Sequence, residues 1–285
     1  MILIGISGST KCDWRLVEDA KILKQVSTGG INPFFHSEEK IAETIKSAGE
    51  LANHFNAIEV AFIYSAGCGS KSLQSIVKRA LSKVIPKAHH YVNHDIVASA
   101  LATYEGVPNI SCILGTGSNS CYFDGDIVRQ ETPALDYILG DQGGGSYYGK
   151  KLLNAYLYKK LPSDLHDTFS AKYNLTKDEI LENVYMKPYA NVYLASFMKF
   201  IEEHKEHEYF QSMLQKGMSE FMDLYITPFS KHQTIKTHFT GAISYIFQDI
   251  LKPVAEQKGI LVGQIIKEPI DDLVQYHIKK HYQKS

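Results

Sequence analysis

Two short stretches of small and hydroxyl-bearing residues have the composition of phosphate-binding loops. One is Ser7-Gly-Ser-Thr-Lys11, directly after the apolar run 1–6, and the other is Gly115-Thr-Gly-Ser-Asn119, directly after the apolar run 110–114. Small residues let several backbone N–H groups converge on a phosphate, and Ser and Thr hydroxyls add further hydrogen-bond donors. Lys11 could neutralise phosphate charge. Each stretch could equally be an ordinary tight turn, and neither is a Walker A loop, so the pair is more informative than either member.

Asp95 could act as a general base. It lies between a predicted strand over 90–93 and a predicted helix that begins at Ile96. Ligands of α/β proteins bind at the carboxyl ends of strands, and a carboxylate there can accept the proton of an attacking hydroxyl group. Asp is also a preferred N-cap residue of helices, so a purely structural role at the start of the helix stays open.

Three further places could contact a polar ligand. Asp141 is the only charge within Gly140–Gly145, where its carboxylate could accept hydrogen bonds from the hydroxyls of a polyol. Asn32, after Gly29-Gly30, has the same potential. Gly241-Ala-Ile-Ser244 joins a predicted strand to a predicted helix and could lie against a nucleotide base. Helix capping and close backbone packing explain these residues equally well.

The composition is that of a globular protein with a substantial core. Of the 285 residues, 44% are hydrophobic, which suits one large domain or two ordinary ones. The net charge of −1 gives no indication of binding to nucleic acid or to an anionic membrane surface. No apolar run reaches the roughly 18 residues of a membrane span, and the N-terminus lacks the features of a signal peptide.

The four cysteines indicate a reducing environment. Cys12, Cys68, Cys112 and Cys121 share no CxxC pair. Free thiols are typical of proteins in a reducing compartment, and we therefore expect a cytoplasmic location.

The hydrophobic pattern predicts alternating strands and helices in both halves of the chain. Residues 1–27 have the pattern of three short strands, and Asp124-Gly125 between two alternating runs predicts a β-hairpin. The further predicted strands are 59–64, 90–93, 110–114, 234–239 and 260–266. The predicted helices are 37–54, 72–84, 96–104, 147–160, 243–258 and 271–282, and residues 163–230 are helical in pattern.

Both halves share one order of elements: a strand, a glycine-containing turn, a hairpin, and then helices that alternate with strands. This alternation predicts an α/β fold in which helices cover mixed sheets. The shared order suggests a structural repeat, with two sheets that face each other across a cleft. The helical residues 163–230 would then be an insertion in the second half.

Six motifs follow one another along most of the chain: Ser7–Trp14, Gly29–Pro33, Asn93–Asp95, Leu114–Asn119, Gly140–Gly143 and Phe239–Ile243. This ordered set resembles the BadF/BadG/BcrA/BcrD-type ATPases, especially their N-acetylglucosamine kinase branch within the actin-like ATPase and sugar kinase superfamily. Together the motifs are specific to the superfamily, and less specific to the amino-sugar kinase branch.

The resemblance implies two actin-like (ribonuclease H-like) domains of mixed sheets flanked by helices, which face a cleft for ATP and sugar. The N-terminal domain would span residues 1–107, and a closing helix at about 270–285 would pack back on it. The C-terminal domain would span 108–269 and carry the helical insertion at about 163–230. Kinases of this kind are commonly dimers, so a homodimer stays open.

The resemblance also implies a role for each motif. Asp95 would be the catalytic base that takes the proton of a sugar's 6-hydroxyl, and magnesium would bridge the phosphates of ATP. The residues implied to bind ATP are Gly8, Ser9, Thr10, Lys11, Gly115, Thr116, Gly117, Gly241 and Ser244. The residues implied to bind the sugar are Asn32, Ser118, Asn119 and Asp141. The implied reaction is phosphorylation of an amino sugar, N-acetylglucosamine or glucosamine, by ATP.

One residue of the first loop departs from the family pattern. When Thr10 is aligned with the family's Thr, Ile6 stands where the family has an aspartate that helps to hold hydrated magnesium. An aliphatic side chain offers no oxygen ligand, although it continues a buried strand well. Asp13 and Asp95 are candidate replacements as metal ligands. This departure motivates a second hypothesis, a weakened kinase that senses sugar or nucleotide.

A third hypothesis is an activator ATPase of a dehydratase or reductase, as in the other branch of the family. Those proteins hold an iron–sulfur cluster with cysteines at a dimer interface. The four cysteines of this chain do not follow that branch's cysteine motifs, so this hypothesis has the least support. For a kinase, the expected partners are a sugar and ATP, with no nucleic acid and no membrane.

Overall fold

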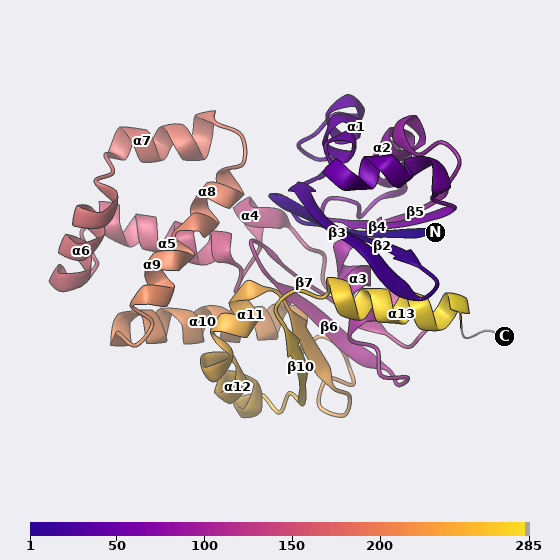
Figure 1. Ribbon diagram of the computed structural model, residues 1–285. Coiled ribbons are helices and arrows are strands. Elements are labelled where there is room, and N and C mark those ends of the chain that lie inside the picture. Colours follow the sequence, from indigo (N-terminus) through magenta and orange to yellow (C-terminus); the bar gives the residue numbers. More distant parts are fainter. Residues whose placement is uncertain (283–285) are drawn as a thin grey trace. The chain divides into compact units, whose positions relative to one another are not determined.

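The chain folds as two compact units, each built on its own five-stranded mixed sheet. The computed structural model describes residues 1–282, and Figure 1 shows its elements coloured along the sequence. Unit 1 comprises Met1–Gly106 and the segment that begins at Glu268, and unit 2 comprises Val107–Lys267. Two mixed sheets flanked by helices confirm the α/β fold class predicted from the sequence.

The sheet of unit 1 has the strand order β3-β2-β1-β4-β5. Strands β1 (Ile2–Ser7), β2 (Lys11–Glu18) and β3 (Lys21–Gly29) form an antiparallel meander, which confirms the three strands predicted near the N-terminus. Strands β4 (Val60–Ser65) and β5 (His89–His94) continue the sheet parallel to β1. Because β1, β4 and β5 run in one direction, their carboxyl ends meet at the same edge of the sheet.

Helices α1 (Glu38–Lys46) and α2 (Lys71–Val84) cover one face of this sheet. Their apolar side chains share a hydrophobic core with Leu3 of β1. Both helices begin at a serine N-cap, since the hydroxyls of Ser37 and Ser70 accept hydrogen bonds from backbone N–H groups of the first turn. A cap of this kind satisfies one of the donors that a helix start leaves without an internal partner.

Helices α3 (Asp95–Ala102) and α13 (Ile270–Tyr282) cover the other face. They form a second core with Ile2 and Ile4 of β1, so alternate residues of that strand are buried on opposite sides. Helix α13 confirms the helix predicted over 271–282. The last residues of the longer predicted range, 283–285, lie outside the described residues.

One predicted helix of unit 1 is shorter than expected. The sequence predicted a helix over 37–54, whereas α1 ends at Lys46 and Gly49–Ala57 forms a separate 3₁₀ helix. Gly49 has a φ of +55°, a left-handed conformation through which an α-helix does not continue and which glycine adopts at little steric cost. The helix therefore ends where glycine lets the chain change direction.

The sheet of unit 2 has the order β10-β9-β6-β7-β8. Strands β6 (Asn109–Leu114), β7 (Ser118–Phe123) and β8 (Val128–Arg129) form an antiparallel meander. Strand β9 (Thr237–Thr240) runs parallel to β6, and β10 (Val262–Ile266) runs parallel to β9. Both sheets thus have a meander followed by two parallel strands, which confirms the structural repeat that the shared order of elements suggested.

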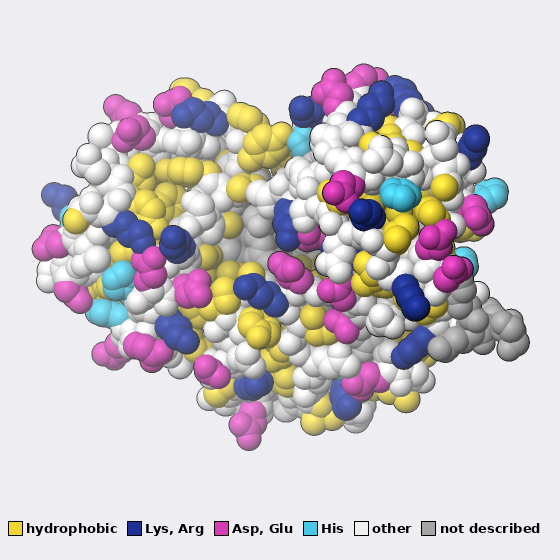
Figure 2. Space-filling model, in the orientation of Figure 1, with side chains coloured by type: hydrophobic (Ala, Val, Ile, Leu, Met, Phe, Trp, Pro, Cys, Tyr) yellow, Lys and Arg dark blue, Asp and Glu magenta, His cyan; other side chains and the backbone are white. Residues whose placement is uncertain are grey.

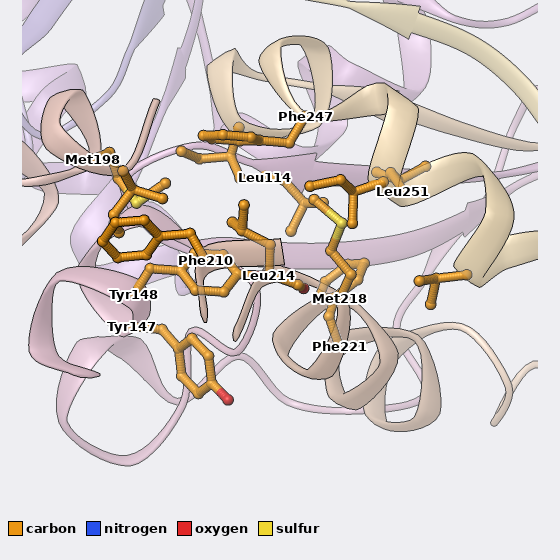
Figure 3. Close-up of a cluster of buried hydrophobic side chains, with 14 of the residues drawn as sticks. Leu114, Tyr147, Tyr148, Met198, Phe210, Leu214, Met218, Phe221, Phe247 and Leu251 are labelled. Carbon is orange, nitrogen blue, oxygen red and sulfur yellow. The ribbon is translucent and has the colours of Figure 1, made fainter. Parts of the chain in front are cut away.

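Helices enclose the largest hydrophobic core of the described chain, in unit 2. Figure 3 shows Tyr148, Phe210, Leu214 and Phe221 converging there with Leu114 of β6. The residues 163–230 supply much of this core, so their predicted helical pattern is confirmed. The helical segments of unit 2 are α4 (Asp136–Leu139), α5 (Gly145–Leu157), α6 (Ser163–Tyr173), α7 (Lys177–Leu181), the π-helix Glu182–Met186, α8 (Ala190–Ser196), α9 (Met198–Glu203), α10 (Glu208–Tyr225), α11 (Ala242–Ile246) and α12 (Gln248–Gln257).

The helix predicted over 243–258 is divided in two, as α11 and α12. Phe247 separates them with a backbone conformation outside the helical region (φ −105°, ψ 27°), and its ring is buried in the core of unit 2. Among the described residues, no helix is both long and apolar enough to span a membrane.

Candidate active site

The first loop is the turn Gly8–Thr10 between β1 and β2, and the end of β3 locks it in place. The N–H of Gly30 donates to the carbonyl of Thr10 at 3.0 Å. A Cβ atom on Gly30 would lie 2.5 Å from the carbonyl oxygen of Gly8, so only glycine fits beneath the turn. The Ser7 hydroxyl accepts the N–H of Ile31 at 2.8 Å. Serine and glycine therefore hold the loop while its tip stays accessible.

Asp95 lies at the carboxyl edge of the parallel strands. Ser7, Ser65 and His94 are register partners at the ends of β1, β4 and β5, and Asp95 follows directly. It is the first residue of α3, whose N-cap position is taken by His94, so the N-cap interpretation of Asp95 is wrong. One carboxylate oxygen is 3.2 Å from Nε2 of His94, and the side chain is 22% exposed. A carboxylate is therefore accessible where the three parallel strands end.

Asn32 contacts the loop that follows β4, which leaves the sheet at the same edge. Its amide oxygen accepts the N–H of Phe34 at 2.9 Å, and its side chain is buried. Gly67 has a φ of +77°, and a Cβ atom on it would lie only 2.1 Å from that oxygen. Two residues later, a Cβ on Gly69 would be 3.9 Å from the His94 ring. The loop after β4 thus connects the surroundings of Asn32 to those of Asp95.

This connecting loop also places a thiol near Asp95. Burial, and to a lesser degree the Asp95 charge, raise the pKa of Cys68 to about 12, so the thiol stays neutral. The loop was not singled out from the sequence. The sequence feature that could have revealed this loop is the stretch Ser65-Ala-Gly-Cys-Gly69, in which small residues directly follow a predicted strand. A search for glycine at every strand end would have found it.

Charges gather beside the first loop on the strand opposite Ile6. Ile6 of β1 and Asp13 of β2 are cross-strand register partners. Asp13 Oδ1 lies 2.9 Å from the ammonium nitrogen of Lys11 and accepts the Ser27 hydroxyl at 2.5 Å. Glu268 lies 3.7 Å from the same nitrogen. The hydrogen bond to Asp13 raises the pKa of Lys11, so the lysine stays charged beside these carboxylates at the base of the loop.

The second loop, between β6 and β7, is held by backbone hydrogen bonds. Gly115 N–H donates to the Gly117 carbonyl at 3.0 Å, and the Gly115 carbonyl accepts the N–H of Gly145 at 2.8 Å. The Thr116 carbonyl accepts the N–H of Ser146 at 2.9 Å. A Cβ on Gly144 would be 2.8 Å from the carbonyl carbon of Gly117. The start of α5 therefore packs directly on this loop.

Asp141 anchors this loop from beneath. Its Oδ1 accepts the N–H of Ser118 at 2.9 Å, and its Oδ2 accepts the hydroxyl of Ser146 at 3.3 Å. The side chain is 7% exposed, and burial raises its pKa from 3.8 to about 6. Ser146, which the sequence analysis did not single out, is the first residue beyond the glycine cluster. In this structure Asp141 joins two glycine-rich segments, and its predicted contact with sugar stays a prediction.

The remaining predicted residues of unit 2 lie around the same loop. The Asn119 amide oxygen accepts the N–H of Ser120 and Nε2 of Gln130 at 2.8 and 2.7 Å. The Ser118 hydroxyl is buried without a hydrogen-bond partner among the described residues. Gly241 has a φ of +113°, and a Cβ there would lie 2.4 Å from the carbonyl oxygen of Leu114. The Ser244 hydroxyl donates to the Gly241 carbonyl at 3.0 Å.

A groove of about 820 Å³ elsewhere in unit 2 is separate from these residues. It lies between α5 and α10, and four lysines line it, at positions 150, 151, 160 and 216. Figure 2 shows basic side chains over the helices at the left, where Figure 1 places α5. None of the predicted site residues lines the groove.

A solved structure of a protein from Porphyromonas gingivalis is similar to this chain over its full length. That protein, a “putative N-acetylglucosamine kinase”, is 33% identical, with 99% of this chain and 100% of that chain covered and a TM-score of 0.91. This chain belongs to the same family. No family model matches the chain, and no curated protein matches it.

Two more distant structures share the fold of this kinase family. A “putative N-acetylglucosamine kinase” from Chromobacterium violaceum is 14% identical, with a TM-score of 0.73 and coverage of 96% of this chain and 98% of that one. A ROK family glucokinase from Streptomyces griseus, solved with glucose and AMPPNP, is 15% identical, with a TM-score of 0.56 and coverage of 96% and 97%. These two more distant structures show that the fold of this family member is that of a two-domain sugar kinase.

Asp13 and Asp95 supply carboxylate oxygens, which are donors of the kind that magnesium binds. Among the described residues, no group of three or more His, Cys, Asp or Glu side chains is placed to hold a metal ion. Magnesium typically keeps several waters and binds through one or two carboxylates together with substrate phosphates. Asp13 and Asp95 are the predicted carboxylates, and Lys11 already places a cation against Asp13.

Proposed function

We propose that the protein transfers the γ-phosphoryl group of ATP to the 6-hydroxyl of an amino sugar, N-acetylglucosamine or glucosamine. Membership in a family with a “putative N-acetylglucosamine kinase” supports the substrate class. The observation that carries the proposal is the position of Asp95. Its partly exposed carboxylate follows the aligned ends of β1, β4 and β5, where a hydroxyl nucleophile could give up its proton.

Each unit supplies part of the proposed chemistry. In unit 1, the loop Gly8–Lys11 would bind ATP phosphates through backbone N–H groups, hydroxyls and the lysine, and Asn32 would contact the sugar. In unit 2, Gly115–Gly117 would bind phosphate, and Gly241 with Ser244 would form part of the adenosine pocket. The sugar contacts proposed there are Ser118, Asn119 and Asp141. The unpartnered, buried hydroxyl of Ser118 supports this, because such a group is expected to find a partner when a ligand binds.

Magnesium, when bound with ATP, would neutralise charge on the transferring phosphoryl group. We propose Asp13 and Asp95 as the carboxylates of this chain that face it. Asp13 is held by Ser27 and Lys11, so its side chain is oriented before any ligand arrives. Asp95 would remain the proton acceptor.

A second candidate function is a weakened kinase that acts as a sensor of sugar or nucleotide, and Ile6 favours it. The side chain of Ile6 packs against the core that α3 and α13 form with β1, so it is an integral strand residue without ligand oxygens. The substitution Ile6→Asp discriminates between the two functions. A rise in turnover of about tenfold or more, equivalent to about 1.4 kcal/mol of barrier, would favour the sensor. Efficient native turnover would remove its basis.

The activator ATPase has less support than either. All four cysteines are buried free thiols, and the pKa values of Cys12 and Cys112 are raised by burial. Buried neutral thiols are poor cluster ligands. A brown, iron-containing preparation would revive this hypothesis. Membership in the BadF/BadG-type ATPases, a cytoplasmic location and a homodimer stay predictions.

The direct test is a coupled assay of ADP release over a panel of hexoses and amino sugars with ATP and millimolar magnesium. We expect N-acetylglucosamine or glucosamine to give the highest kcat/KM. The absence of turnover with every sugar, in a preparation whose circular dichroism shows a folded protein, would refute the kinase.

A further inference from the structure

The cross-strand partner of Ile6 is a carboxylate residue, Asp13, as the register of β1 and β2 shows. The two residues are directly opposite each other in the antiparallel pair. Side chains at such positions lie on the same face of a sheet, with Cβ atoms about 5 Å apart. The neighbouring pair confirms the geometry, since a Cβ on Gly5 would be 2.8 Å from the ring of its partner Trp14.

This shared face is the one on which Asp95 begins its helix. Ile6 packs with the core that includes Ala98 of α3 and Leu273 of α13. Asp13 is on the same face, because its neighbours Cys12 and Trp14 are buried in the core on the other side. The carboxylate of Asp13 and the helix that carries Asp95 therefore belong to one side of the sheet.

A cation already occupies the position beside Asp13. The Lys11 ammonium lies 2.9 Å from Asp13 Oδ1, and 48% of the lysine side chain is exposed. The lysine is also the residue of the first loop whose charge would be drawn to ATP phosphates. If the lysine turned toward a bound phosphate, Asp13 would lose this cationic partner at the base of the loop. Its Ser27 hydrogen bond keeps it oriented toward that place.

We propose that Asp13 supplies, from the neighbouring strand, the carboxylate that orders the hydrated magnesium of bound ATP, and that Lys11 is the stand-in cation of the nucleotide-free protein. The proposal rests on the proposed function, since it concerns the ATP site of that kinase. It explains how the first loop can still bind magnesium together with ATP although position 6 is an isoleucine. Magnesium needs only one or two protein carboxylates, each of which can act through a water ligand.

Isothermal titration calorimetry with AMPPNP tests the proposal without requiring turnover or sugar. For the native protein we expect magnesium to tighten AMPPNP binding by about tenfold, or about 1.4 kcal/mol. Asp13→Asn is nearly isosteric, keeps an oxygen acceptor for Ser27, and should abolish most of this enhancement. Glu268→Gln removes the other carboxylate near Lys11 and is the matched control, which should keep the enhancement.

A carboxylate exchange is the sharper variant. Because the two positions are opposite each other, Ile6→Asp combined with Asp13→Asn should restore the magnesium enhancement that Asp13→Asn loses. An undiminished enhancement in Asp13→Asn would overturn the proposal, as would equal losses in Asp13→Asn and Glu268→Gln. A native protein whose AMPPNP affinity is independent of magnesium would overturn it too. ADP release in the sugar panel is scored separately, so failure of Asp13 and failure of the kinase are distinguishable.

Discussion

The two proposed phosphate loops have the same place in the two sheets but are built by different means. Each connects the first two strands of a meander, β1 to β2 in unit 1 and β6 to β7 in unit 2. The turn Gly8–Thr10 is held by the backbone N–H of Gly30 and by the Ser7 hydroxyl, and the charged residues Lys11, Asp13 and Glu268 lie beside it. The turn Gly115–Gly117 is held by backbone hydrogen bonds and by one buried carboxylate, Asp141.

The difference indicates a division of tasks. The first loop carries mobile charge at its base, where a long lysine side chain can exchange one partner for another. The second loop is closely packed at Gly117 and Gly144, where a Cβ atom would lie 2.6 and 2.8 Å from its nearest neighbour, so that α5 contacts the loop directly. Charge compensation is thus expected from unit 1, and a fixed backbone cradle from unit 2. Each of the following variants tests one side of this comparison.

The largest expected effect is on catalysis, from Asp95→Asn in unit 1. Removing a general base lowers turnover by about 10²–10⁴-fold, and the isosteric amide should leave the fold and sugar binding intact. The measurement is kcat by coupled assay, with sugar affinity by calorimetry. Asp136→Asn, at the exposed start of α4, is the matched control and should keep native turnover. A kcat of Asp95→Asn within about threefold of native would contradict its role as base.

Replacing one glycine by alanine in each loop should lower the free energy of unfolding more in the second loop than in the first. In Gly117→Ala the new Cβ would lie 2.6 Å from Asp141 Oδ1, whereas in Gly8→Ala it would be 4.0 Å from the nearest atom, the carbonyl oxygen of Lys11. We expect Gly117→Ala to lower the free energy of unfolding by about 2–4 kcal/mol and Gly8→Ala by less than about 1 kcal/mol. Urea denaturation measures both. Equal losses in the two variants would remove the contrast in packing.

The buried carboxylate of the second loop predicts a pH dependence. Burial raises the pKa of Asp141 from 3.8 to about 6, so the folded state binds its proton more tightly than the unfolded state. Its contribution to stability is then greatest at low pH and is lost as the pH rises through about 4 to 6. The shift corresponds to about 3 kcal/mol in total, of which about half falls between pH 5 and pH 7.

Asp141→Asn should remove this dependence. Asparagine keeps an acceptor for the Ser118 N–H and tolerates the left-handed backbone of position 141, where φ is +60°. Urea denaturation at about pH 5 and about pH 7 gives the change in the free energy of unfolding between the two pH values for each protein. This change should be larger for the native protein than for Asp141→Asn. Parallel profiles of the two proteins would show that Asp141 does not titrate in this range.

The smallest expected effect is that of Lys11→Met in the first loop. Methionine keeps much of the aliphatic stem and removes the charge, so nucleotide affinity should fall by about five- to tenfold, or about 1 kcal/mol. The loss should shrink at high salt, because nearly half of the lysine side chain is exposed and its charge is screened. AMPPNP titrations at low and high salt measure it, and an unchanged affinity at low salt would show that Lys11 does not bind phosphate.

The sequence predicted the fold class and most strand and helix types, because the alternation of apolar residues and the hairpin signal are local. It failed where a longer-range cause decided. The helix predicted over 37–54 ends at Lys46, shortly before the left-handed Gly49, and the helix predicted over 243–258 breaks at Phe247, whose ring is buried. The spacing of apolar residues predicts that a segment is helical, but it does not predict where one residue with a non-helical backbone conformation interrupts the helix.

For the candidate site, the sequence identified residues but not their partners. Asp95 was found as a strand-end carboxylate, yet its place as first helical residue, after His94, came only from the structure. The pairing of Ile6 with Asp13 depends on the register of β1 against β2. A turn longer or shorter by two residues would pair Ile6 with a different residue. The anchoring of the second loop by Asp141 joins Ser118 to a residue 23 positions away. Contacts of this kind require the fold.

The proposed phosphoryl transfer is tested most directly by identifying the product. The purified protein is incubated with ATP, magnesium and N-acetylglucosamine or glucosamine, and the mixture is followed by ³¹P NMR and mass spectrometry. We expect a sugar phosphorylated at its 6-hydroxyl, formed in equal amount to ADP, and no such product with the Asp95→Asn protein. ATP that stays intact with both sugars, or phosphorylation that continues unchanged in Asp95→Asn, would contradict it.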